Sequence, residues 1–156
     1  MRTLLHPASK SAALTDLALL VSRVALGVIL LAHGLQKLNE FTLAGTAASF
    51  DKMGVPAPTA AATFATAVEI VGGAALILGL LTPVVALLNT FNLLGALVLV
   101  HARNGVFVEK GGYELVLALA AGLVVIAMLG AGKVSVDGLI GRRYVRSSPR
   151  RATATA

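Results

Sequence analysis

The chain has 156 residues, of which 57% are hydrophobic and 13% are charged, and its formal net charge is +6. A soluble domain has about a quarter of its residues charged, so this chain carries too few charges to cover a surface that faces water. It contains no cysteine, which excludes disulfides, thiolate metal sites and a dithiol redox cycle within the chain. The composition predicts a protein whose outer surface faces lipid.

Four apolar segments are long enough to cross a bilayer, because a membrane-spanning helix needs roughly 20 mainly apolar residues. They cover residues 14–38, 59–80, 83–101 and 112–129. Only a short turn separates the second segment from the third, and Pro83 opens the third, where its missing N–H costs nothing. We therefore expect an all-α integral membrane protein in which residues 14–132 form a four-transmembrane-helix bundle.

The connection between the first two segments predicts a further, shorter helix. Its stretch FTLAGTAASFDKMG has a helical composition and ends at Gly54, with Pro56 beyond it. Phe41 and Phe50 within this stretch suit the boundary between lipid and water. We expect a short interfacial helix in this first loop.

Lys and Arg residues are distributed unequally between the two sides of the expected bundle. Four spans put both ends of the chain, residues 1–13 and 133–156, on one side of the membrane. That side carries eight of the thirteen Lys and Arg residues and the other side carries four, since Arg23 lies inside the first span. Loops rich in Lys and Arg stay in the cytoplasm, so we predict that both termini are cytoplasmic.

Residues 133–156 form a basic tail without an apolar pattern, and we expect this tail to be disordered. Its charge could attract anionic lipid head groups, by about 1 kcal/mol for each basic residue near the surface, or it could only enforce the topology. Six of the thirteen basic residues lie at or after Lys133. The excess positive charge therefore belongs to the tail, and it indicates a membrane surface or a protein as partner, and no nucleic acid.

Several charged residues lie inside the predicted spans, where such side chains usually face the bundle interior or a cavity. Glu69 lies well inside the apolar run TAVEIVGGAALILGLL. In the first span, Arg23, His33 and Lys37 fall on one face of the helix together with two glycines, as an interhelical face would. We expect Glu69 to pair with one of these three residues. Such a pair could only fix the helix register, or it could take part in binding or proton transfer.

The other spans add polar groups to this interior. Asn89 and Asn92 are three residues apart in the third span and suit hydrogen bonds between helices. The predicted cofactor-binding cluster consists of Arg23, His33, Lys37, Glu69, Asn92, His101, Tyr113 and Glu114. The two histidines differ in depth and no further ligands accompany them, so we predict neither a haem nor a metal site.

Four motifs stand in order along the chain: SRVALGVILLAHGLQKL, FDKMGVP, VEIVGGAALILGLLTP and NGVFVEKGGYELVLALA. Together, over residues 17–132, they resemble the DoxX family of small bacterial membrane proteins. The resemblance implies a four-helix protein of the bacterial inner membrane that is associated with redox or thiol-stress systems. Some relatives are subunits of thiosulfate:quinone oxidoreductase. Others, in actinobacteria, form a membrane complex with a superoxide dismutase and a thiosulfate sulfurtransferase.

Three functions are compatible with these residues. The first is a membrane subunit of a redox or oxidative-stress complex that offers a quinone pocket, with soluble redox or sulfur-transfer proteins as partners. The second is a membrane anchor without chemistry of its own. The third is a small-molecule or proton-coupled transporter, which four spans suit only in a homo-oligomer, and Ala118 and Gly122 provide small residues for such contacts. Whether the chain is an enzyme stays open at this point.

Overall fold

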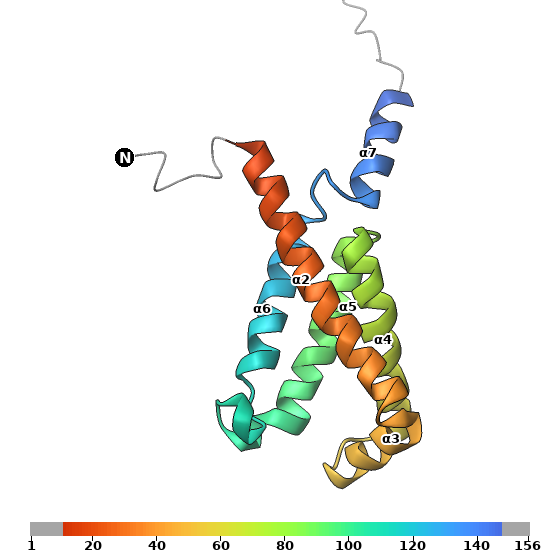
Figure 1. Ribbon diagram of the computed structural model, residues 1–156, viewed down its shortest axis with the longest axis vertical. Helices are drawn as coiled ribbons and strands as arrows, with labels where there is room; N and C mark the ends of the chain where they lie inside the picture. Colours follow the sequence, from red (N-terminus) through yellow and green to blue (C-terminus); the bar gives the residue numbers. More distant parts are fainter. Residues whose placement is uncertain (1–10, 148–156) are drawn as a thin grey trace, which may run out of the picture.

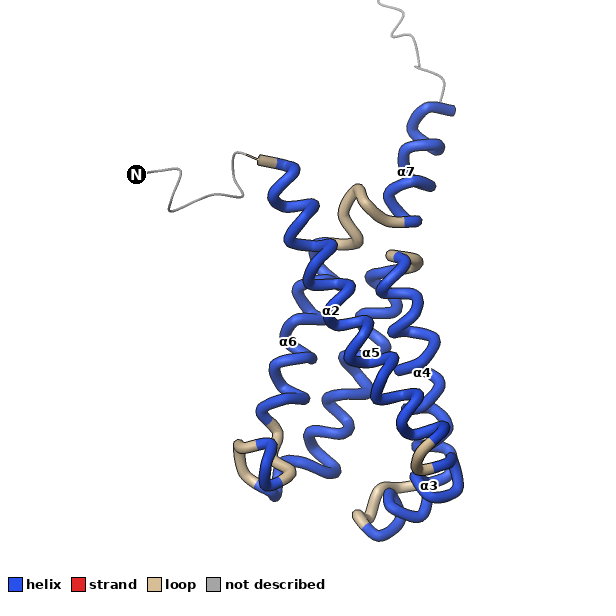
Figure 2. The backbone as a smooth tube through the Cα atoms, in the orientation of Figure 1, coloured by secondary structure: helices blue, strands red, loops and turns tan. Residues whose placement is uncertain are grey.

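The computed structural model describes residues 11–147, and these residues are helical apart from turns and loops (Figures 1 and 2). The helices are α2 (Ala12–Asn39), α3 (Thr42–Lys52), α4 (Pro58–Leu78), α5 (Thr82–Ala96), α6 (Glu114–Leu129) and α7 (Val136–Ser147). A π-helical turn, Leu97–His101, and a 3-10 turn, Ala102–Asn104, continue α5. A second 3-10 turn, Val108–Lys110, lies in the loop before α6.

The predicted membrane bundle is confirmed. Three stretches, Ala12–Asn39, Pro58–Leu78 and Thr82–Asn104, are long and apolar enough to cross a membrane. The fourth apolar helix, α6, has 16 residues. Its length is about 24 Å, somewhat less than a hydrocarbon core of roughly 30 Å. The expected helix in the first loop is present as α3, and its position at the membrane interface stays a prediction.

The bundle is built from two helix pairs, because α2 packs along α4 and α5 packs along α6. Glycines allow the close approach of the first pair. A Cβ atom added at Gly27 would lie 2.7 Å from the carbonyl oxygen of Gly73, and one added at Gly34 would lie 2.8 Å from the amide nitrogen of Ile70. The glycine face predicted for the first span is therefore its contact with α4.

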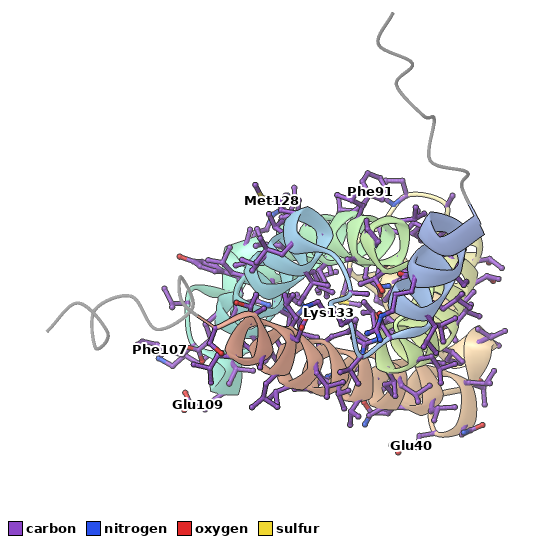
Figure 3. The ribbon with its side chains drawn as sticks, turned by 90° about the horizontal axis from the view of Figure 1, so that it is seen from above. Glu40, Phe91, Phe107, Glu109, Met128 and Lys133 are labelled. Atoms are coloured by element: carbon purple, nitrogen blue, oxygen red, sulfur yellow. The ribbon has the colours of Figure 1, made fainter. Side chains whose placement is uncertain are left out.

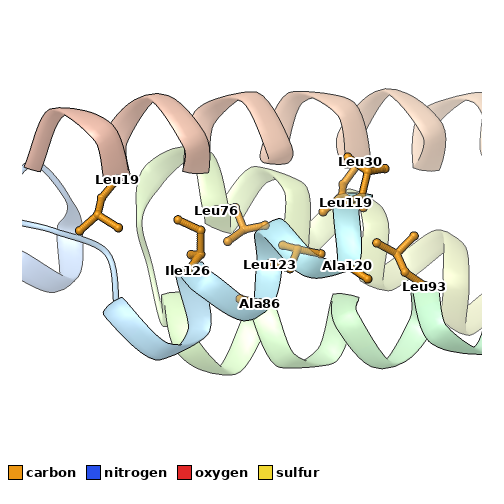
Figure 4. Packing of buried hydrophobic residues seen from close by; sticks show 9 residues of the cluster. All are labelled: Leu19, Leu30, Leu76, Ala86, Leu93, Leu119, Ala120, Leu123 and Ile126. Carbon is orange, nitrogen blue, oxygen red and sulfur yellow. The ribbon is translucent and has the colours of Figure 1, made fainter. Parts of the chain in front are cut away.

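The apolar core joins the two pairs. Figure 4 shows its nine buried residues, which are Leu19, Leu30, Leu76, Ala86, Leu93, Leu119, Ala120, Leu123 and Ile126. Large apolar side chains also cover the outside of the bundle, and Phe91 and Met128 on its rim are 71% and 80% exposed (Figure 3). An outer surface of this kind is stable in lipid and not in water.

The tail does not begin where the sequence indicated, because residues 136–147 form α7. The hydroxyl of Ser135 accepts the N–H of Gly138 at 2.9 Å, as a helix N-cap does. The Asp137 carboxylate accepts the N–H groups of Leu81 and Thr82, both at 2.8 Å, at the start of α5. The prediction of a disordered tail from residue 133 is wrong for this segment, since its first turn is tied to the α4–α5 hairpin. The rest of the predicted tail, residues 148–156, lies outside the described residues.

The two ends of the bundle differ in what they hold. At the first, here called the tail end, the chain enters α2 and leaves through α7 (Figure 1). There the Lys133 N–H donates to the Asp16 carboxylate at 3.0 Å. At the opposite end, here called the cavity end, lie α3 and the loop before α6. Toward this end the α2–α4 pair and the α5–α6 pair separate (Figure 1).

Candidate ligand-binding cavity

A cavity of about 510 Å³ lies between the two helix pairs at the cavity end. Pockets for small molecules and cofactors typically have about 300–1,000 Å³ and mostly apolar walls with a few polar groups. The walls here are mainly Leu, Val, Ala and Phe side chains. Five of the predicted polar residues line the cavity, and they are His33, Lys37, Glu69, Asn92 and His101.

Three helices contribute one polar side chain each to a hydrogen-bonded group, which we call the polar triad. Lys37 of α2 donates to one oxygen of Glu69 in α4 at 2.6 Å, and Asn92 of α5 donates to the other oxygen at 3.2 Å. The side chain of Glu69 is only 6% exposed. A buried carboxylate is tolerated when it is paired and hydrogen-bonded. The partner of Glu69 is therefore Lys37, one of the three that the sequence offered.

The local folding of α2 and α3 places Lys37 within reach of Glu69. Gly34 is one turn before Lys37, and a Cβ atom there would lie 3.0 Å from the Cβ of Glu69. At the same place the Thr46 hydroxyl of α3 donates to the carbonyl oxygen of Lys37 at 3.3 Å. The missing side chain at Gly34 thus brings α4 close, and α3 holds the end of α2.

The two histidines are oriented by backbone carbonyls. Nδ1 of His101 donates to the carbonyl oxygen of Gly111 at 2.7 Å, and Nδ1 of His33 donates to that of Ile29 at 2.9 Å. Because a carbonyl oxygen only accepts, Nδ1 carries the hydrogen, and in the tautomer that keeps only this hydrogen Nε2 is an acceptor. The π-helical turn that ends at His101 shifts this ring relative to a regular helix, as such turns often do at functional sites.

Arg23 does not join the polar triad, which corrects the predicted cluster. Its guanidinium donates to the carbonyl oxygen of Val134 at 2.8 Å and packs against Gly79, and the residue is 1% exposed. Along α2 it lies 14 residues before Lys37, which is about 21 Å. The partners of Arg23 come from the α4–α5 turn and from the segment before α7. Neither segment had been assigned to a site from the sequence.

Tyr113 and Glu114 shape the loop before α6 and do not line the cavity. The Tyr113 N–H donates to the carbonyl oxygen of Gly105 at 3.1 Å, and the Glu114 carboxylate accepts the N–H of Val108 at 2.7 Å. The hydrogen bond expected between helices is present for Asn92. Asn89 donates instead to a carbonyl of its own helix, that of Val85, at 3.1 Å.

Sequence reasoning missed the apolar residues that give the cavity its shape, above all Phe64, Phe91 and Gly95. In the sequence they resemble any other lipid-facing positions. As to metals, no group of three His, Asp or Glu side chains within residues 11–147 is close enough to hold an ion. The cavity combines hydrogen-bond donors, acceptors and apolar walls, which suits an amphipathic organic molecule.

The family model described as DoxX matches residues 18–102 of the chain. The uncharacterized membrane protein Rv3486 of Mycobacterium tuberculosis is 30% identical over 141 residues, which cover 82% of this chain and 84% of the relative. "Putative oxidoreductase CatD" of Bacillus subtilis is 27% identical, with coverage of 80% and 88%, and the inner membrane protein YqjF of Escherichia coli is 29% identical, with coverage of 84% and 98%. No solved structure matches the chain.

Proposed function

The chain belongs to the DoxX family, and we propose that it is the membrane subunit of a redox complex whose cavity binds the head group of a quinone. The observation that carries the proposal is the polar triad at the wall of an apolar cavity of about 510 Å³. The name of one relative, "Putative oxidoreductase CatD", agrees with this assignment.

The donors and acceptors of the cavity fit the two forms of a quinone. The ring carbonyls of the oxidised form accept hydrogen bonds, which the Lys37 ammonium and the Asn92 amide can donate. The hydroxyl groups of the reduced form donate, and His33 and His101 can accept through Nε2. A bound quinone would supply the electron chemistry, while the side chains of this chain hold the ring and exchange its protons.

The chain has no cysteine, so it cannot carry electrons as a dithiol, and other proteins would deliver them to the quinone. Soluble redox or sulfur-transfer proteins would dock at the tail end, where α7 lies and where Lys133 and Arg142 add positive charge. With the termini in the cytoplasm, as the excess of Lys and Arg indicates, these partners would be cytoplasmic. The basic residues at and after Lys133 would also attract anionic lipid head groups.

Native mass spectrometry of the chain, extracted in mild detergent from its own membrane, tests the proposal. We expect a bound quinone mass on the wild-type chain and its loss in Glu69→Gln, because the neutral amide no longer forms an ion pair with the Lys37 ammonium. Glu40→Gln is the matched control, since Glu40 is exposed at the end of α2 and does not line the cavity. A wild-type chain that carries no small molecule would contradict the proposal.

One observation favours the anchor as a second candidate. Figure 1 shows α7 beyond the bundle. Its residues Leu139 and Ile140 are 58% and 56% exposed. If the protein only recruits partners, the double substitution Leu139→Ser with Ile140→Ser should release co-purifying proteins, and Glu69→Gln should release none. The opposite pattern would leave the quinone pocket as the explanation.

A further inference from the structure

The polar triad bridges the contact line, or seam, between α4 and α5 at one level of the bundle. At that level the Asn92 amide of α5 reaches the Glu69 carboxylate of α4 at 3.2 Å. One helical turn closer to the cavity end, about 5.4 Å away, the residues on the same two faces are Ala65 and Gly95. Both line the cavity, and both are small. Side chains therefore bridge α4 and α5 at the level of the triad, whereas one turn away only two small residues lie between the helices.

Gly95 differs from the glycines that mediate helix contacts. A Cβ atom at Gly27 or Gly73 would lie within 2.7 Å of the neighbouring helix, whereas a Cβ atom at Gly95 would meet nothing within 4 Å. Glycine inside a helix costs up to about 1 kcal/mol relative to alanine. Since no close contact requires it, the glycine at position 95 leaves space between α4 and α5.

Two aromatic rings lie beside this space. Phe64 and Phe91 directly precede Ala65 and Asn92, and their rings meet edge to face with centroids 6.5 Å apart and an interplanar angle of 80°. Both line the cavity, and they are 41% and 71% exposed. Figure 3 shows Phe91 on the outer rim of the bundle, across from α2. The rings thus connect the wall of the cavity to the lipid-facing surface.

We propose that the cavity opens to the bilayer between α4 and α5, through a window framed by Ala65 and Gly95 with Phe64 and Phe91 beside it. The ligand is then a membrane-dissolved molecule with a long apolar tail. Its polar head reaches the triad, and its tail lies in the window against the two rings. The identity of the head group rests on the proposed function, but the route and the tail do not.

Substitution of Gly95 by leucine places a branched side chain in the window, and its Cβ atom has no neighbour within 4 Å. We would measure the binding of a tail-less benzoquinone and of the same ring with a decyl chain to the full chain in mild detergent. The wild type should bind the decyl compound at least about ten-fold more tightly, the gain expected from burying two methylene groups. Gly95→Leu should abolish this preference, so that the variant binds the decyl compound and the tail-less ring with affinities within about two-fold of each other.

Val98→Phe is the matched control, because Val98 lies in the π-helical turn after α5, is 64% exposed and does not line the cavity. It adds bulk to the lipid face and should leave both affinities unchanged. Leu115→Trp adds bulk at another place in the cavity wall, on α6. If it, and not Gly95→Leu, removes the preference for the tail, the opening lies beside α6 and the window is wrong.

A second measurement tests the window without any quinone. The chain has no cysteine, so Val116→Cys introduces a single thiol in the cavity wall on α6. A long-chain alkyl maleimide supplied from the lipid should label this thiol, and Gly95→Leu should slow the labelling at least about ten-fold. Unchanged labelling would overturn the window even if quinones bind. If quinones fail to bind but the labelling is slowed, the window stands and the proposed function fails.

Discussion

The two ends of the bundle use polar side chains in different ways. At the tail end, side chains are bonded to backbone: Asp137 accepts the N–H groups of Leu81 and Thr82, and Arg23 donates to the carbonyl of Val134. At the cavity end, the Glu69 carboxylate is bonded to the side chains of Lys37 and Asn92, and this triad borders an open volume. Polar side chains that form hydrogen bonds with backbone groups hold segments together, whereas polar side chains that face a cavity remain available to a ligand.

Glycines show the same contrast. At the tail end a Cβ atom on Gly79 would collide with the Arg23 guanidinium, and Gly79 has a φ angle of +70°. At the cavity end a Cβ atom on Gly95 would meet nothing within 4 Å. Substitutions at the tail end should therefore mainly change the stability of the fold, and substitutions at the cavity end should mainly change ligand binding.

The largest effect is expected for Gly79→Ala, which should lower the free energy of unfolding by about 4 kcal/mol. Left-handed backbone costs a non-glycine residue about 1–2 kcal/mol, and displacement of Arg23 removes a charged hydrogen bond that contributes roughly 1.5–3 kcal/mol. Unfolding by SDS, followed by circular dichroism, measures the change. A loss below about 1 kcal/mol would show that the tail end tolerates rearrangement.

Lys37→Met should cost somewhat less, about 3 kcal/mol, because it leaves the Glu69 carboxylate buried without its cation. Replacement of both partners, Lys37→Met with Glu69→Leu, should restore stability to within about 1 kcal/mol of the wild type, since a buried ion pair adds little net stability. Both variants should lose the bound quinone in native mass spectrometry. A double variant as unstable as the single one would make this pair a structural element, like those of the tail end.

Asp137→Asn should destabilise the attachment of α7 by about 1.5 kcal/mol. The amide keeps one acceptor oxygen for the start of α5 and loses the second, together with the negative charge that favours a helix N-terminus. The rate at which trypsin cleaves after Arg142 reports the release of α7 and should rise about ten-fold. Asp51→Asn, at an exposed position of α3, should leave this rate unchanged.

The smallest change in the free energy of unfolding is expected for Gly95→Ala. Its sign should be opposite to that of Gly79→Ala. The methyl group meets nothing and alanine favours a helix, so the free energy of unfolding should rise by up to about 1 kcal/mol. The same SDS titration measures this change. Destabilisation would mean that the space beside Gly95 is filled by contacts that the structure does not show.

Much of the fold could be predicted because its causes are local. Runs of apolar residues have the length that a bilayer requires, and a proline at the start of α5 marks the tight hairpin. The positions of Lys37 and His33 relative to Gly34 follow from the period of a helix, so the face of α2 that meets α4 was predictable. The burial of Glu69 followed from its apolar neighbours in the sequence.

Which cation meets Glu69 depended on the tertiary structure. Arg23 and Lys37 lie on the same face of α2, and helical periodicity does not distinguish them. The return of the chain through Val134 places a backbone carbonyl beside Arg23, while the crossing of α2 and α4 at Gly34 places Glu69 beside Lys37.

For α7 and the cavity, the sequence by itself determined almost nothing. The helix α7 forms where Asp137 reaches N–H groups more than fifty residues earlier in the chain, a contact that no local pattern encodes. The cavity exists because two tightly packed helix pairs separate toward one end. Its volume and its window depend on interhelical angles, which are set by all the packed side chains together and not by any one segment.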